Sequence, residues 1–422
     1  MKIFFAAFVA VFVCLSSMAS PVASSGRQKV PHYPIDIPPD ASGRAYANYF
    51  IKKGFRTEGK NDPVEESILI GTRSLQWLQV INKARAVGQK LELTTAALAT
   101  GSPPEAPKIY NAQIIAQNLQ QLKSGLPSEM AQVLLQGGAL TPTIKISDAE
   151  FLLWARKTDK FYQTASRWTL MQPYLAHYAG YRKSDLRGYY FLARETDLES
   201  KLKGFSQLPA ADQTRMKAHL ELLCINKLGL NANCAALLKS SVQANQVPQF
   251  FNSYFKTAES LWKDYFVIGS SRSDFVWNSS QPNDLFIPFK TPGSLDIQNW
   301  LQSNIQDEWK WKGWQLHLNF QSSADIHVEF TPGVTPHVNG LGGNTITMDA
   351  NTSLEDYEPG WTIRHEFGHV AGFPDCYIEF YDTRISSMVN YQLDLENLMC
   401  SRKGHLQQTH FDELKRVYYR AN

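Results

Sequence analysis

Apolar residues recur at helical spacing through the first two thirds of the chain. The segment 62–65 supplies an N-cap aspartate, a proline at the first helical position and an acid in the first turn. Ile68, Leu75 and Leu78 follow on one face of that helix. A capping box over Ser147–Glu150 predicts a second long helix. Its apolar positions, which we interpret as core rather than as a ligand site, are Phe151, Trp154, Phe161, Ala165 and Trp168.

These patterns predict a mostly helical domain over residues 46–270, in which we find no fixed repeat period. Residues 20–45 are rich in proline, serine and glycine and predict an extended lead-in.

After about residue 270 the pattern changes to strands and one helix. Alternating or short apolar runs predict strands at Leu285–Phe289, Trp314–Phe320, Ile326–Phe330 and Ile346–Met348. Ser294 is positioned to cap a helix that ends at Gly313, with Ile297, Leu301, Ile305 and Trp309 on one face. The segment 332–343 is predicted to be a loop or a short edge segment. Residues 271–422 are therefore expected to form an α/β domain with a mixed sheet of about four or five strands, which makes the whole chain α+β.

The first residues have the pattern of a secretory signal. Lys2 precedes an apolar run from Ile3 to Leu15, and Ser17-Met18-Ala19 fits a small-x-small cleavage site. The alternative is a membrane anchor, but thirteen apolar residues are too few to span roughly 30 Å of hydrocarbon. We therefore expect a signal peptide over residues 1–19, no membrane span in the mature protein, and a secreted or periplasmic location.

Composition excludes some functions. The chain has 422 residues, of which 43% are hydrophobic and 19% charged, which is enough for a sizeable core and favours two domains. Forty-two basic residues stand against 39 acidic ones, and no Lys/Arg-rich block marks a nucleic-acid surface. We expect no nucleic-acid partner.

Export changes the meaning of the cysteines, because disulfides persist in oxidising compartments. Once Cys14 is removed with the signal peptide, four cysteines remain in two local sets, Cys224 with Cys234 and Cys376 with Cys400. Four cysteines allow three pairings. Loop-closing bridges are favoured over free thiols, and also over a zinc site, because there is no Cys-x-x-Cys spacing.

One segment carries the candidate chemistry. His365 and His369 are four residues apart, so on a helix both imidazoles project from one face and can bind one zinc ion. Glu366, beside the first histidine, is placed to act as the base that takes a proton from water acidified by the metal. Gly372 is suited to end the helix with positive φ, and the turn that follows can carry Asp375 back to the metal. The alternative is that both histidines are core residues on a buried helix and bind no metal.

This segment resembles the extended motif of the metzincin zinc peptidases, His-Glu-x-x-His-x-x-Gly-x-x-His or Asp followed by a methionine-containing turn. Leu398-Met399-Cys400 looks like that turn and precedes a closing helix with Phe411, Leu414 and Val417. The aspartate at the third ligand position is similar to the snapalysin type. Some metzincins place a tyrosine two residues after the methionine, whereas this chain has Ser401.

The resemblance implies a five-stranded sheet whose antiparallel edge strand receives the substrate as an added strand. It also implies that Met399 forms a hydrophobic floor beneath the zinc. Cys376 directly follows Asp375 and Cys400 directly follows Met399, so the resemblance further implies a disulfide between them.

The sequence thus predicts a secreted endopeptidase that acts on proteins or peptides with one catalytic zinc ion held by His365, His369 and Asp375. One alternative is a gluzincin-like site with Glu379 or Glu396 as third ligand. Another is an exported helical binding module that carries an inactive or structural zinc domain. The helical half is expected to be either a pro-region or a permanent accessory domain.

Overall fold

The computed structural model describes residues 62–86, 88–93, 106–331, 334–350, 352, 354 and 357–420, all of which belong to one compact unit. The predicted signal peptide (1–19), the lead-in (20–45) and the start of the helical region lie outside the described residues. Within the described part, no helix combines the length and the apolar character needed to cross a membrane. Helices and strands are both present, as expected for an α+β chain.

The first helical group contains α2 (Pro63–Lys83), α3 (Ala112–Gly125), α4 (Ser128–Leu134) and α5 (Asp148–Met171). The predicted caps are formed, because Asp62 accepts a bond of 2.9 Å from the Val64 amide and Ser147 accepts one of 3.2 Å from the Glu150 amide. Helices α2 and α5 pack closely because Gly71 has no side chain. A Cβ there would lie 2.2 Å from the Cβ of Tyr162. Phe151, Ala165 and Trp168 are buried as predicted, while Trp154 and Phe161 are half-buried.

The second helical group follows α5. Its helices are α6 (Leu175–Gly180), α7 (Arg187–Leu192), α8 (Leu198–Lys203), α9 (Ala210–Leu228), α10 (Cys234–Gln243) and α11 (Val247–Asp264). Short turns of helix lie between them at η1 (Gln172–Tyr174), η2 (Tyr181–Ser184) and η3 (Phe205–Gln207). Cys224 and Cys234 are at disulfide distance, with Cα atoms 5.7 Å apart, so the predicted local pair joins α9 to α10.

The strands of the second half form two small mixed sheets. In the first sheet β5 (Trp314–Gln321) lies between β3 (Asp284–Lys290), which is parallel to it, and β4 (Lys310–Trp311), which is antiparallel. In the second, β8 (Thr345–Asp349) lies between parallel β6 (His327–Thr331) and antiparallel β7 (His337–Val338). All four predicted strands are present, and β7 falls in the segment predicted as a loop or edge. The sequence predicted one sheet of about five strands, whereas the structure has two separate sheets. A hydrogen bond of 2.7 Å from the Lys290 amide to the Ile326 carbonyl links them.

The helices of this half are α12 (Leu295–Leu301), α13 (Tyr357–Val370) and α14 (Gln408–Tyr418). Ser294 caps α12 as predicted, and the helix continues through η4 (Gln302–Gln306). It ends there and not at Gly313 as predicted, because β4 already begins at Lys310. A pair of short parallel strands, β2 (Trp277–Asn278) and β11 (Tyr419–Arg420), joins the beginning of this half to its end. The core formed by these elements is continuous with that of the second helical group.

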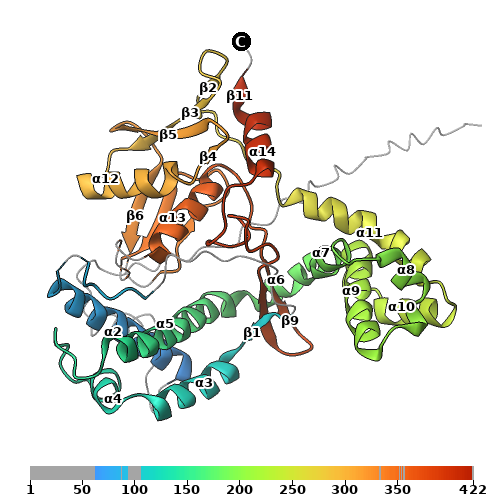
Figure 1. Cartoon of the computed structure of the whole chain (residues 1–422), viewed down its shortest axis with the longest axis horizontal. Helices are drawn as coiled ribbons and strands as arrows, with labels where there is room; N and C mark the ends of the chain where they lie inside the picture. Colours follow the sequence, from blue (N-terminus) through green and yellow to red (C-terminus); the bar gives the residue numbers. More distant parts are fainter. Residues whose placement is uncertain are drawn as a thin grey trace, which may run out of the picture. The chain divides into compact units, whose positions relative to one another are not determined.

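A hairpin that sequence reasoning missed links the two halves. Strands β9 (Ile378–Asp382) and β10 (Ser387–Tyr391) pair antiparallel, and β1 (Lys108–Tyr110), from the helical half, adds to the free side of β10 (Figure 1). The Tyr110 hydroxyl donates to the carboxylate of Glu379 on β9 at 2.8 Å. The helical half is therefore part of the same sheet as the segment that follows Asp375.

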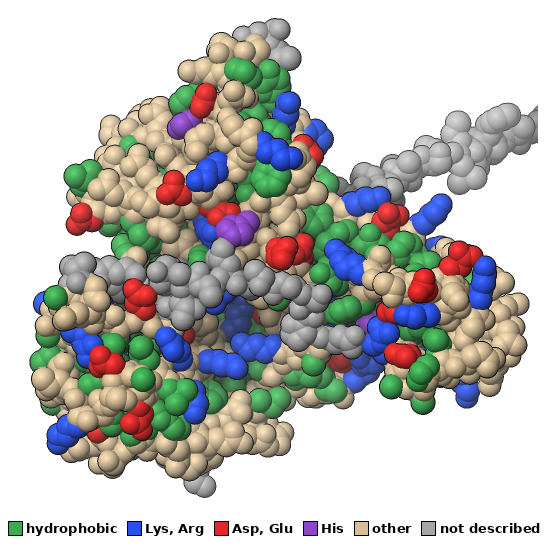
Figure 2. Space-filling view, in the orientation of Figure 1, with side chains coloured by type: hydrophobic (Ala, Val, Ile, Leu, Met, Phe, Trp, Pro, Cys, Tyr) green, Lys and Arg blue, Asp and Glu red, His purple; other side chains and the backbone are tan. Residues whose placement is uncertain are grey.

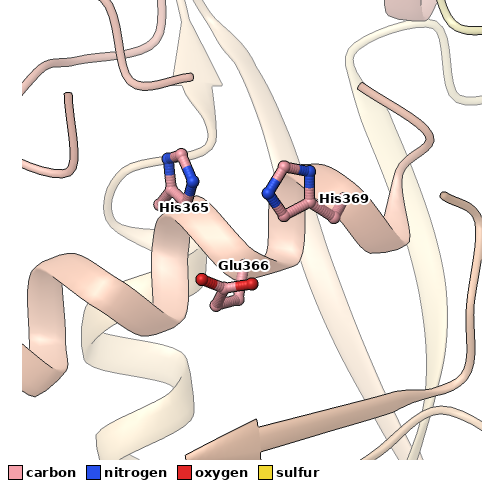
Figure 3. A group of neighbouring side chains, drawn as sticks. All are labelled: His365, Glu366 and His369. Atoms are coloured by element: carbon pink, nitrogen blue, oxygen red, sulfur yellow. The ribbon is translucent and has the colours of Figure 1, made fainter. Parts of the chain in front are cut away.

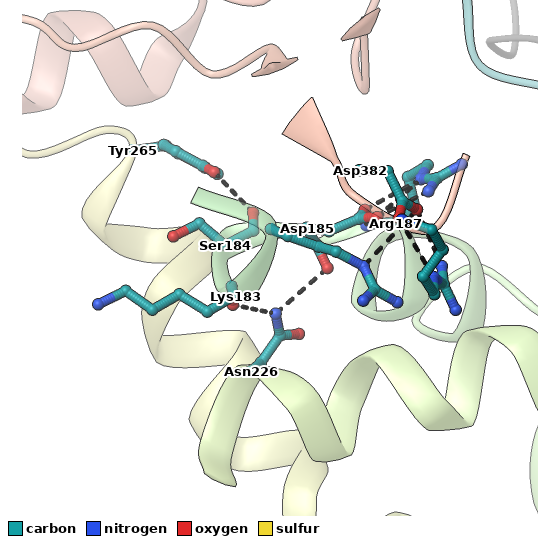
Figure 4. Close-up of polar contacts among 9 residues, drawn as sticks. Lys183, Ser184, Asp185, Arg187, Asn226, Tyr265 and Asp382 are labelled. Atoms are coloured by element: carbon teal, nitrogen blue, oxygen red, sulfur yellow. Dashed lines mark hydrogen bonds and ion pairs between the residues drawn. The ribbon is translucent and has the colours of Figure 1, made fainter. Parts of the chain in front are cut away.

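An ion pair joins the other end of this hairpin to the second helical group, beside polar contacts within that group (Figure 4). Asn226 of α9 donates to the backbone carbonyl of Asp185 at 3.2 Å, and the Asp185 carboxylate pairs with Arg187 at 2.7 Å. Asp382, at the end of β9, lies 3.8 Å from the Arg182 side chain. The hairpin end thus meets the second helical group through the pair of Asp382 with Arg182.

Candidate metal centre

The candidate site is built on α13, whose last two turns carry His365, Glu366 and His369. Figure 3 shows the two imidazoles projecting from the same side of the helix, one turn apart, with Glu366 between them along the chain. Their ring centroids are 4.9 Å apart, and ligand-type atoms of all three residues lie within 4.8 Å of one another. His365 is 3% exposed and Glu366 is 6% exposed, so the group is largely shielded from solvent.

Each imidazole is held by its Nδ1 atom. His365 Nδ1 lies 2.7 Å from the carbonyl oxygen of Leu398, and His369 Nδ1 lies 2.8 Å from that of Phe373. A carbonyl oxygen only accepts hydrogen bonds, so Nδ1 is the protonated nitrogen in each ring when the ring is neutral. The Nε2 lone pairs are then free for a cation. Fixing the tautomer through the other nitrogen is how metal-binding histidines are oriented.

Asp375 completes the convergence. Its Oδ1 atom lies 3.1 Å from His365 Nε2 and 3.2 Å from His369 Nε2. Two ligand atoms of a tetrahedral zinc ion, each bonded at about 2.0–2.1 Å, are about 3.3 Å apart. The separations therefore fit three corners of a zinc site, and two neutral imidazoles with one carboxylate are donors that zinc accepts. These three ligands would leave the fourth position of a tetrahedral zinc ion open.

The route of the chain to Asp375 depends on Gly372. This glycine has φ +95°, as the sequence predicted for the residue that ends the helix. A Cβ there would also lie 2.4 Å from the carbonyl oxygen of Ser270. Because glycine has no side chain, the backbone of residue 270 can lie against the turn that ends α13.

Without a metal, His369 and Asp375 form an oppositely charged pair. Burial lowers the pKa of His369, but the neighbouring Asp375 carboxylate outweighs it, and the pKa is raised from 6.5 to about 9. Burial raises the pKa of Asp375, but His369 and His365 hold it well below the ordinary value of 3.8. A zinc ion would replace the imidazolium proton as the positive charge facing Asp375.

The other candidate third ligands are engaged elsewhere. Glu379 accepts from Tyr110, from Asn390 at 3.3 Å and from the guanidinium of Arg167. Glu396 is exposed, in the loop that follows β10. Of the three carboxylates considered from the sequence, Asp375 is the one that the structure brings to both histidines.

The turn around Met399 supports the site from the C-terminal side. Met399 is fully buried, and Gly368 makes room for it, because a Cβ at that glycine would lie 2.3 Å from the Met399 Sδ. The Cys376 amide donates to the Met399 carbonyl at 3.1 Å, and Cys376 and Cys400 are at disulfide distance with Cα atoms 4.4 Å apart. The same turn therefore supports His365 through the Leu398 carbonyl and Asp375 through its neighbour.

Glu366 faces a cleft of about 280 Å³ that both halves of the chain line. Its carboxylate makes no hydrogen bond or ion pair with any residue that the structure describes. Lys108, Tyr162 and Arg167 from the helical half line the cleft opposite Thr335 and other residues of the second half. The carboxylate is thus available to water or substrate in the cleft.

Sequence reasoning missed the wall that the helical half contributes. Arg167 lies on a helix of which the sequence indicated only the apolar core positions, and neither Lys108 nor Tyr110 belongs to a recognisable motif. The contacts of Arg167 and Tyr110 with Glu379 join residues more than 200 positions apart, so no local pattern carries the signal.

Comparisons of this chain with protein-family models, with curated proteins and with solved structures found no match.

Proposed function

We propose that this protein is a zinc-dependent endopeptidase of the metzincin type, with His365, His369 and Asp375 as metal ligands and Glu366 as catalytic base. The observation that carries the proposal is the approach of both Nε2 atoms to one Asp375 oxygen, at 3.1 and 3.2 Å, while both Nδ1 atoms are tied to backbone carbonyls. A structural zinc site would normally be closed by a fourth protein ligand.

A bound zinc ion would supply a Lewis acid and make water more acidic. The residues of this chain would do the rest. The unpaired Glu366 carboxylate takes a proton from the attacking water and passes it to the amine of the cleaved peptide bond. Leu398 and Phe373 keep the imidazoles in the ligand tautomer, and Met399 fills the space beneath α13.

The substrate would bind along β7, the antiparallel edge strand of the β6-β8-β7 sheet, which packs against α13. An edge strand can accept an extended peptide as an added strand, whose backbone then needs no particular sequence. Proteins and peptides with flexible segments are the substrate class that fits. Both disulfides fit an oxidising compartment, and we propose export from the cytoplasm.

The test compares wild type with Glu366→Gln on a quenched fluorescent peptide library, with zinc content measured on the same samples. Glu366→Gln should keep the metal and lose hydrolysis by about a hundredfold or more, because the ligands remain and the base is gone. Glu396→Gln, which changes an exposed glutamate, is the matched control and should retain full activity.

Full activity of Glu366→Gln would refute the mechanism. Wild type that binds zinc but cleaves none of the library would instead favour the binding module with an inactive zinc domain. Activity that survives complete removal of metal by a chelator would exclude a zinc peptidase altogether.

A further inference from the structure

The wall of the cleft that the helical half contributes includes Lys108 on β1. The register pairs Lys108 with Asn390 on β10 and Asn390 with Glu379 on β9, so these three residues share one face of the sheet. Lys108 and Glu379 both line the cleft, and their strands are two ladder spacings, or about 10 Å, apart. This face of the sheet therefore extends from the segment after Asp375 to the wall of the cleft that β1 contributes.

Most charged groups along the cleft are already paired. Arg167 binds Glu379 through its guanidinium, and Arg402 lies 2.9 Å from Glu358. The remaining aspartates accept from neutral donors, Asp349 from the Tyr162 hydroxyl at 3.1 Å and Asp159 from the Gln163 amide at 2.9 Å. Apart from the residues of the proposed metal site, Lys108 is the charged residue of the cleft lining that these contacts do not include.

Lys108 is different because its amino group has no hydrogen bond or ion pair with the described part of the chain, and its side chain is exposed. Although Lys108 is exposed, the walls of the cleft partly desolvate its ammonium group and lower its pKa, and the like charges of Lys160, Arg402 and Arg167 act in the same direction against Glu379. Three of the four charged groups that act on the ammonium are cations, and an anion brought to it would offset their repulsion. Figure 2 shows Lys and Arg side chains gathered in and beside the recess on this face of the molecule.

We propose that Lys108 is a specificity-determining residue that binds a carboxylate of the substrate, so that the protein prefers peptides with an acidic group near the cleavage site. This inference rests on the proposed peptidase function and deepens it. The carboxylate can belong to an aspartate or glutamate side chain or to a free C-terminus. Lys108 and Glu366 line the same cleft, so the acidic group should lie near the cleaved bond.

The experiment uses pairs of short peptides, cut at the same bond by wild type, that differ only in Glu against Gln, each with a free or an amidated C-terminus. Wild type should show about a fivefold higher kcat/KM for the acidic member of a pair, the size expected for one solvent-accessible ion pair. Lys108→Gln should abolish the preference, Lys108→Arg should retain it, and Lys108→Glu should favour a lysine-containing peptide. Lys239→Gln, on the exposed side of α10, is the matched control and should leave it unchanged.

A second arm measures binding of the same peptides to the Glu366→Gln protein by fluorescence anisotropy, with and without Lys108→Gln. If wild type cleaves nothing but binding still favours acidic peptides through Lys108, the anion site stands and the peptidase function fails. If only peptides with a free C-terminus are favoured, the site binds a terminal carboxylate. Hydrolysis and binding without any acidic preference, or a preference that survives in Lys108→Gln, would overturn the proposal.

Discussion

The two disulfides offer a controlled test of how the proposed metal site is supported. The Cys376–Cys400 bridge joins the residue after Asp375 to the residue after Met399, across a sequence separation of 24. The Cys224–Cys234 bridge joins α9 to α10 across a separation of 10 and shares no element with the metal site. Replacing Cys376 and Cys400 with alanines therefore removes the bridge beside the proposed site. Replacing Cys224 and Cys234 removes a bridge between helices that carry none of its residues.

Loop-closure entropy predicts similar losses of stability. Removing the longer loop should lower the free energy of unfolding by about 3.5 kcal/mol, and removing the shorter by about 2.7 kcal/mol. All four cysteines are buried, so loss of sulfur packing should add a comparable cost in both variants. The two variants should consequently differ by only about 1 kcal/mol in urea unfolding.

Metal affinity should separate them. Supporting contacts around metal ligands typically contribute about 10- to 100-fold to affinity, so Cys376→Ala/Cys400→Ala should weaken zinc binding by about that factor. Cys224→Ala/Cys234→Ala should leave it unchanged. The assay is competition with a zinc-binding dye under conditions where both variants are folded. Equal affinities in the two variants, or a larger loss in the Cys224/Cys234 variant, would refute the positional role of the bridge near the metal.

Two further predictions concern stability. Burial lowers the pKa of His410 from 6.5 to about 3, so its neutral form stabilises the fold fully above pH 6.5 and this stability is lost as pH falls toward 3. Urea unfolding of metal-free protein should show the drop between pH 7.5 and pH 5 shrinking by about 2 kcal/mol in His410→Phe, and an unchanged drop would contradict the shift. Gly372→Ala should cost about 2–4 kcal/mol from positive φ and the clash with Ser270. Gly137→Ala, at φ +74° with nothing within 4 Å of its Cβ, should cost less, and equal losses would mean that the contact with residue 270 contributes nothing.

Local patterns were sufficient for the parts of the fold that depend on neighbours in sequence. The strand at Trp314–Gln321 and the cap at Ser147 follow from alternation and from one side chain bonding a nearby amide. The motif around α13 also predicted that Gly372 would have positive φ and that Asp375 could return toward the histidines, because both properties lie within ten residues of His365.

Long-range pairing could not be predicted in the same way. The turn between β9 and β10 has no glycine, and Ser386 takes φ +48° instead, so the hairpin lacks the usual turn signal. Strand β1 has only three residues and pairs with a strand about 280 positions later, where no periodicity connects them. Apolar alternation likewise did not indicate that the expected five-stranded sheet would be divided into β3-β5-β4 and β6-β8-β7.

We propose that the side chains of His365, His369 and Asp375 hold one zinc ion. The most direct test of this proposal is the zinc-to-chain ratio, measured by elemental analysis after dialysis against trace zinc, in wild type and four variants. Wild type should retain about one zinc per chain. His369→Ala and Asp375→Ala should lose it, while Glu379→Ala and Glu396→Ala should retain it because those carboxylates lie outside the ligand set. Wild type without zinc, or full zinc retention by Asp375→Ala with loss in a glutamate variant, would contradict the account.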